Sequence, residues 1–188
     1  MPVTTLDAKA ALIVIDLQKG IAGFPTLRPL DEIVEQVNSL SSAFRQRKLP
    51  VILVVAAGGS PGRTDAPARH MELPADFADL LPNLAVDPSD HRITKRTRGA
   101  FTGTDLEAYL REQGVTQVVV TGVATSNGVE STARHAYELG FNVVLPTDAM
   151  TDGNADAEAY SVTRVFPKLA ETGTTKAILD LFEAGLAS

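Results

Sequence analysis

Two charged side chains follow apolar segments that read as β-strands, and together they could do acid–base chemistry. Asp16 comes directly after the apolar run 11–15, and Lys95 ends the extended segment 91–94. A carboxyl group at the end of a strand is placed to donate or accept a proton, and a nearby ammonium could orient an anion or stabilise charge. Each residue alone also has a structural explanation, since Asp often caps a helix and a single Lys is often a solvated charge.

A third candidate segment, residues 121–134, opens a predicted helix directly after another apolar run. Backbone N–H groups at the start of such a helix would face a crevice as an anion or oxyanion site. Ser126 could be read as a nucleophile, but no histidine base accompanies it in the sequence. A helix cap or a polar contact with substrate is therefore the preferred interpretation of Ser126 and Asn127.

The elements that must position these residues follow from an alternation of apolar runs and helical stripes. Runs rich in β-branched residues occur at 11–15, 51–55, 118–120 and 143–145. They lack a polar–apolar alternation, as expected for strands covered on both faces of a parallel sheet. Between them lie three helical stripes: Ile33, Val37, Leu40 and Phe44; Leu106, Tyr109 and Leu110; and Val129, Ala133, Ala136 and Tyr137. The pattern predicts a doubly wound α/β fold, whose ligand crevice lies at the carboxyl ends of the strands.

Composition narrows the function classes. The chain has 188 residues, of which 44% are hydrophobic, and a formal net charge of -6. We expect one domain over residues 1–188, no nucleic-acid partner and no anionic membrane surface. No apolar run is long enough for a membrane helix and no signal peptide is evident, so we expect a cytoplasmic protein. There is no cysteine, which excludes disulfides, thiolate metal sites and a thiol nucleophile.

Three ordered motifs carry a family resemblance. They are Asp16-Leu17-Gln18 after a strand, Lys95 ahead of the segment 99–104, and the segment 122–125 opening a helix, with 147–149 also typical. Together they resemble the isochorismatase-like hydrolase family of the cysteine hydrolase superfamily. The resemblance implies a three-layer α/β/α sandwich with a mainly parallel sheet of about six strands, assembled as a homodimer or a higher homo-oligomer. It also implies a site of Asp, Lys and Cys, of which Asp16 and Lys95 match the first two. Gly128 falls at the position of the Cys.

Gly128 decides between chemistries. Without a thiol there is no thioester intermediate, so the amidase branches of the family lose their nucleophile. A Gly at this position is similar to true isochorismatases, in which an Asp protonates a vinyl ether, water attacks the oxocarbenium ion and pyruvate leaves. Asp16 would be that acid, with Lys95 either orienting a substrate carboxylate or stabilising charge near Asp16. A nearby ammonium lowers a carboxyl pKa, however, so burial or the substrate would have to raise it again. The family's histidine at the position of Ser126 is also absent.

The candidate substrate contacts surround this pair. We predict that Phe24 and Phe101 form pocket walls, that Arg96 and Arg98 bind an anion, and that 124–127 line the pocket. That last group comprises Ala124, Thr125, Ser126 and Asn127. Each has a structural alternative in the core, at a subunit contact or on a solvated surface. The resemblance further implies a cis peptide between Val123 and Ala124.

We expect neither a cofactor nor a metal, since His70, His91 and His135 lie in separate segments. Thr104 and Glu107 are interpreted as a capping box, and the acidic stretch 148–158 as a solvated loop and helix start. Loop 58–74 is long enough to be a functional lid.

Three functions remain open at this point. The first is a cysteine-independent hydrolase acting on a small carboxylated molecule, with a vinyl ether as the most specific bond. The second is a binding or scaffold protein in which catalysis has lapsed. The third is an amide or ester hydrolase in which Asp16 activates water directly.

Overall fold

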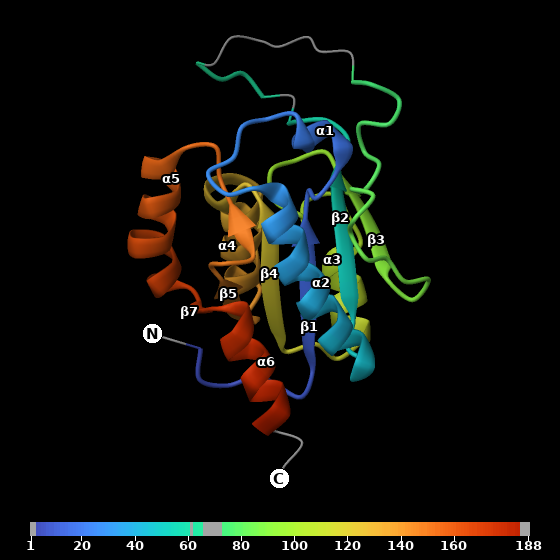
Figure 1. The fold of residues 1–188 in the computed structure, drawn as a ribbon, viewed down its shortest axis with the longest axis vertical. Helices are drawn as coiled ribbons and strands as arrows, with labels where there is room; N and C mark the ends of the chain where they lie inside the picture. Colours follow the sequence, from blue (N-terminus) through green and yellow to red (C-terminus); the bar gives the residue numbers. More distant parts are fainter. Residues whose placement is uncertain (1–2, 61, 66–72, 185–188) are drawn as a thin grey trace.

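The chain folds around one parallel β-sheet. The computed structural model describes residues 3–60, 62–65 and 73–184. The strands lie in the order β3-β2-β1-β4-β5-β7, with β6 paired to β4 (Figure 1). All pairings between these strands are parallel. Their bounds are β1 Ala10–Ile15, β2 Val51–Ala56, β3 His91–Lys95, β4 Gln117–Val123, β5 Asn142–Pro146, β6 Met150–Thr151 and β7 Glu171–Gly173.

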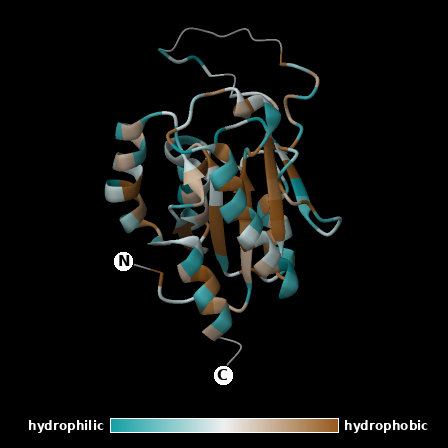
Figure 2. Ribbon diagram, viewed as in Figure 1, coloured by the Kyte–Doolittle hydropathy of each residue, from teal (hydrophilic) through white to brown (hydrophobic). Residues whose placement is uncertain are grey.

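Helices cover both faces of this sheet, which confirms the predicted three-layer α/β/α sandwich. Helices α2 (Leu30–Gln46) and α6 (Thr175–Ala184) pack on one face. Helices α3 (Leu106–Glu112) and α4 (Glu130–Glu138) pack on the other. Every residue of β1 and β4 is buried, and Figure 2 shows brown, hydrophobic strands between helices that carry hydrophilic teal segments. The central strands are therefore apolar on both sides, as their sequences predict.

The helical stripes account for most of the helix–sheet packing. All four predicted residues of α2, from Ile33 to Phe44, are at most 1% exposed. In α4 the stripe is correct for Ala133 and Ala136 but wrong for Tyr137, which is 55% exposed. The apolar face of this helix is thus narrower than the sequence pattern indicates.

The predicted capping box at the start of α3 does not form as expected. The helix begins at Leu106, and the Thr104 hydroxyl accepts a bond from the Leu106 N–H (3.3 Å) and donates to Ala100 O (2.6 Å). Glu107 lies instead 3.6 Å from Arg111 on the helix surface. Thr104 therefore supports the turn into α3 without the reciprocal Glu contact.

Three remaining connections complete the fold around the sheet edge. A short helix α1 (Lys19–Ala22) follows β1, the π-helical turn η1 (Thr125–Val129) joins β4 to α4, and α5 (Ala155–Tyr160) follows β6. After α5 come η2 (Ser161–Val165) and η3 (Phe166–Lys168). Within the described part of the chain, no helix has the length and apolar character needed to cross a membrane.

Candidate active site

The strand order brings Asp16 and Lys95 into direct contact. Asp16 follows β1 and Lys95 ends β3, on either side of the end of β2. The Lys95 Nζ lies 2.8 Å from Asp16 Oδ2, and only 3% of the lysine side chain is exposed. The same ammonium donates to the carbonyl oxygens of Arg98 (3.0 Å) and Thr97 (3.3 Å). Each of its three N–H groups therefore has an acceptor, which is what a buried ammonium requires.

The Asp16 carboxyl group has one oxygen bound and one free. Its Oδ1 is buried and has no hydrogen-bond partner among the described residues, whereas Oδ2 faces Lys95. Burial raises the pKa of Asp16, and the attraction of Lys95 opposes that rise without cancelling it. Of the two opposing effects on the Asp16 pKa, burial is thus the larger one, and it favours the protonated carboxyl group.

The backbone at Asp16 is unusual for a residue with a side chain. Its φ is +53°, in the left-handed region, and its N–H donates to Val54 O at 2.9 Å. Aspartate tolerates this conformation better than most residues. The sharp turn ends β1 and places the carboxyl group at the carboxyl edge of the sheet, where a ligand crevice is expected.

Gly128 lies in η1, close to the acid. A Cβ built at Gly128 would be 3.4 Å from Asp16 Oδ2, 3.3 Å from Val123 O and 2.9 Å from Ile15 Cγ2. A side chain here would therefore require Ile15 to shift. The peptide between Val123 and Ala124 is cis, as the family resemblance implies.

These residues share one cavity of about 720 Å³. Asp16, Lys95 and Gly128 line it, and so do four of the eight predicted substrate contacts, namely Phe24, Arg98, Ala124 and Asn127. The charged side chains around it are Asp16, Lys95, Arg63 and Arg98, so the described lining carries a formal net charge of +2 when Asp16 is counted as ionised. The cavity thus has the opposite sign to the chain, whose formal net charge is -6.

Two predicted substrate contacts lie elsewhere. Phe101 is 6% exposed and packs beside Phe141 and His135, in the core between the sheet and helices α3 and α4. The guanidinium of Arg96 donates to Ala57 O at 2.9 Å and is outside the cavity lining. Arg98 instead lines the cavity and donates to Asn127 Oδ1 at 2.9 Å.

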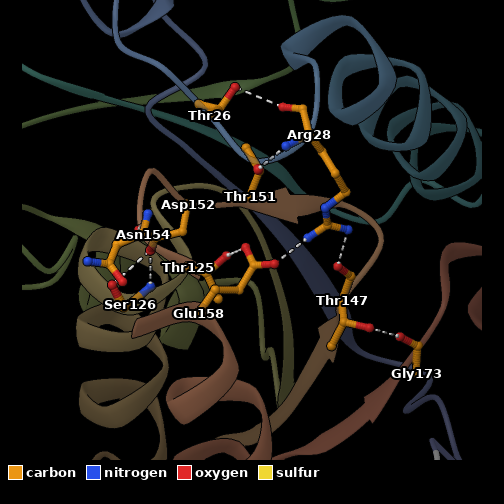
Figure 3. Close-up of polar contacts among 10 residues, drawn as sticks. All are labelled: Thr26, Arg28, Thr125, Ser126, Thr147, Thr151, Asp152, Asn154, Glu158 and Gly173. Atoms are coloured by element: carbon orange, nitrogen blue, oxygen red, sulfur yellow. Dashed lines mark hydrogen bonds and ion pairs between the residues drawn. The ribbon is translucent and has the colours of Figure 1, made fainter. Parts of the chain in front are cut away.

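Thr125 and Ser126 also fall outside the cavity lining, because carboxylates behind η1 bind their polar groups (Figure 3). Asp152 Oδ2 accepts from both the N–H (2.8 Å) and the hydroxyl (2.7 Å) of Ser126. The Thr125 hydroxyl donates to Glu158 Oε2 at 3.0 Å. The nucleophile role weighed for Ser126 therefore has no support in this geometry, and its polar groups fasten the turn.

The acidic stretch 148–158 is thus more than the solvated segment that its composition predicts. Asp152 is 5% exposed, and its Oδ1 also accepts from the Asn154 N–H at 3.0 Å. Glu158 additionally pairs with Arg28 at 3.2 Å, and Arg28 donates to Thr147 O at 2.8 Å (Figure 3). Asp152 comes directly after the two-residue strand β6, which is too short to be predicted from the sequence pattern.

The Arg28 contacts hold the rim of the cavity. Its N–H donates to Thr151 Oγ1 (3.1 Å), and its carbonyl accepts from Thr26 Oγ1 (2.8 Å). The neighbouring Leu27 N–H donates to Asp152 O at 2.8 Å. Since Phe24 and Thr26 line the cavity, these bonds connect the rim to the same carboxylate region that fastens η1.

The histidines that the structure describes lie away from the cavity. His91 stacks on Tyr109, with 3.8 Å between ring centroids, and His135 contacts Phe101. His70 lies outside the described residues. Among the described residues, no group of three or more His, Asp or Glu side chains is arranged to hold a metal ion.

Comparison with known proteins places this geometry in a family. The isochorismatase domain model matches residues 10–177. The isochorismatase family protein YecD of Escherichia coli O157:H7 is 40% identical over 185 residues, covering 93% of this chain and 97% of that protein. YwoC of Bacillus subtilis (strain 168), also an isochorismatase family protein, is 36% identical over 182 residues, covering 92% of this chain and 93% of YwoC. The structure of an isochorismatase family protein from Burkholderia thailandensis superposes with a TM-score of 0.91 at 41% identity, covering 95% of this chain and 98% of that one.

The fold and these similarities identify the chain as a hydrolase with an α/β/α sandwich fold. It belongs to the isochorismatase family.

Proposed function

We propose that this protein hydrolyses a small carboxylated metabolite without covalent catalysis, using Asp16 as the general acid. The main support for this proposal is the environment of the Asp16 carboxyl group. Asp16 is buried and lines the cavity, its Oδ2 pairs with Lys95, and its Oδ1 has no hydrogen-bond partner among the described residues. Burial raises its pKa, which is the direction of shift that a general acid requires. In this proposal Gly128 occupies the position of the family cysteine. The chain contains no cysteine that could act as the nucleophile instead.

The reaction that fits best is vinyl-ether hydrolysis of isochorismate to a dihydrodiol acid and pyruvate. Asp16 protonates the methylene carbon of the enolpyruvyl group, which leaves an oxocarbenium ion and an Asp16 carboxylate. Water adds to the cationic carbon and loses a proton to the carboxylate, and the resulting hemiketal collapses to pyruvate and the ring alcohol. Lys95, held 2.8 Å from Asp16, stabilises the carboxylate that forms in the first step.

The charge of the cavity supports a carboxylated substrate. Lys95 is already saturated by Asp16 and two carbonyl oxygens, so it has no N–H group left for a second anion. Arg98 and Arg63 are then the cations that would bind a substrate carboxylate. Ala124 and Gly128 also line the cavity, and their backbone N–H groups would add neutral donors.

The test is pyruvate release from isochorismate by the parent protein and by Asp16→Asn. Asparagine keeps the shape of the side chain but has no acidic proton, so we expect kcat to fall by about 10²- to 10⁴-fold. Asp156→Asn is the matched control, because Asp156 is exposed on α5, and it should keep the parent rate. Amide or ester hydrolysis without pyruvate release would favour water activation by Asp16. A parent that binds ligand, is unaffected in binding by Asp16→Asn and hydrolyses nothing would favour the lapsed binding protein.

The pH dependence gives a second measure of Asp16. Since the acid must carry its proton, kcat should fall as the pH rises through the raised pKa of Asp16. Stability should follow the same direction, because a raised pKa means that the folded state binds the proton more tightly than the unfolded state. The free energy of unfolding of the parent relative to Asp16→Asn should be highest below the ordinary value of 3.8 and fall as the pH rises through the raised pKa. A difference that does not change with pH would contradict the buried-acid proposal.

A further inference from the structure

We propose that Gly20 and Gln18 are positioning residues that hold Phe77 as a flat wall of the cavity, and that this wall selects ring-bearing carboxylates over linear ones. The inference rests on the proposed function only in taking this cavity as the substrate site. Phe77 lines the cavity and is half-buried, while Gly20 lies behind it in α1.

The Phe77 ring lies directly on the backbone of Gly20. A Cβ built at Gly20 would be 2.5 Å from Phe77 Cγ and closer still to Cδ2 and Cε2. Carbon atoms in van der Waals contact lie about 3.5–4.0 Å apart, so any side chain at this position must displace the ring. The Gly20 N–H also donates to Phe77 O at 2.9 Å, which ties the two backbones together. Only glycine permits this close approach.

Gln18 fixes the same phenylalanine from its carbonyl side. Its side chain is fully buried, and Nε2 donates to Phe77 O (2.8 Å) and to Ala56 O (2.9 Å). Its Oε1 accepts from the Ala56 N–H at 2.7 Å. One amide thus joins the end of β2 to the segment 74–79 and leaves Phe77 little freedom to move along the cavity. The Lys19 pairs with Asp79 (2.9 Å) and Asp76 (3.3 Å) add exposed and therefore weaker support.

The surroundings of Phe77 indicate what it would contact. Ile21, Phe24 and Leu73 line the same cavity, so it has an apolar part besides its cations. An apolar ring with an attached carboxylate would use both parts, since the ring packs on the phenyl face and the carboxylate pairs with arginine. A short linear carboxylate would use only the cations.

The test measures binding of benzoate and of acetate by NMR titration, with no turnover required. The parent should prefer benzoate, and Gly20→Ala should weaken benzoate binding about tenfold while leaving acetate binding within about twofold. Gly23→Ala is the matched control in the same segment, because no described atom lies within 4 Å of a Cβ built there. It should bind both probes as the parent does.

Two further variants separate the wall from general damage to the fold. Phe77→Ala removes every ring atom, Cγ included, and should lose the preference for benzoate by itself. In Gly20→Ala with Phe77→Ala, no atom remains at the position of the Phe77 Cγ to clash with the new Cβ, so the double variant should bind benzoate as Phe77→Ala does. A parent without a preference for benzoate, or a Gly20→Ala protein that keeps it, would overturn the inference. Asp16→Asn should keep the benzoate preference, so failure of the proposed chemistry and failure of the wall give different results.

Discussion

Two walls of the same cavity are held in place by different kinds of interaction. The η1 wall comprises residues 123–128 with the rim 24–28, and it is fastened from behind by the carboxylates Asp152 and Glu158 and by Arg28. The loop wall comprises residues 56–59 and 73–79, and it is fastened by the neutral amide of Gln18 and by the contact of Phe77 with Gly20. Both walls join segments that are far apart in the sequence.

The difference shows how each wall should respond to its surroundings. A buried carboxylate that accepts several N–H and O–H groups makes strong bonds, but removing it leaves those donors without partners. A buried neutral amide makes weaker bonds that do not depend on ionic strength. The η1 wall should therefore be the more costly one to break, and the loop wall the one that is indifferent to salt.

The largest effect is expected from Asp152→Ala. It leaves the Ser126 N–H, the Ser126 hydroxyl and the Asn154 N–H without their acceptor, so the free energy of unfolding should fall by about 3 kcal/mol. Urea unfolding of this variant and of Asp156→Ala, which changes an exposed aspartate in the first turn of α5, measures the difference. The control should change stability by less than about 1 kcal/mol. Equal effects of the two substitutions would show that Asp152 does not fasten the η1 wall.

Gln18→Ala should be the next largest. It removes the bonds to Ala56 N, Ala56 O and Phe77 O, and we expect a loss of about 2 kcal/mol in the free energy of unfolding. Gln113→Ala, at an exposed position after α3, is the control and should change stability by less than about 0.5 kcal/mol. Because the bonds are neutral, the same loss should be measured with and without added NaCl. A loss that disappears in salt would contradict the proposed contrast between the walls.

The smallest effect is expected from Glu158→Gln. The amide can still accept from Thr125 but loses its charge opposite Arg28, whose side chain is 31% exposed. We expect a loss of about 1 kcal/mol that shrinks in about 1 M NaCl, where screening weakens the pair in the parent as well. Unfolding curves at both salt concentrations measure this, and Glu107→Gln, in an exposed surface pair, is the matched control. A loss that does not change with salt would contradict the charge pair with Arg28 as its cause.

The sequence predicts the sheet and the acid–ammonium pair because both depend on local patterns. Apolar runs covered on two faces indicate parallel strands, and the carboxyl ends of such strands meet at one edge, where Asp16 and Lys95 then come together. The prediction that Phe101 lines the cavity is wrong because no local pattern decides its position. An aromatic residue in a turn can face either the core or the cavity, and the sequence around it is the same in both cases.

The fastenings of both walls are harder to predict because they join distant segments. Gln18 contacts Ala56 and Phe77, and nothing local marks their backbones as its partners. Asp152 lies in a stretch whose composition indicates solvent exposure, and only the packing of η1 against it makes that carboxylate buried. Composition describes the average environment of a segment, whereas these contacts depend on how two segments meet.

The left-handed backbone at Asp16 implies a trade between durability and turnover. Asp16 has a side chain in this conformation, and its desolvated carboxyl group has one oxygen without a hydrogen-bond partner among the described residues. Both features destabilise the folded state relative to an ordinary turn. Glycine at position 16 would release the torsional part of that cost, about 1 kcal/mol, and the desolvation with it. A substitution in the turn after β1 could therefore make the folded protein more stable only by removing the proton donor.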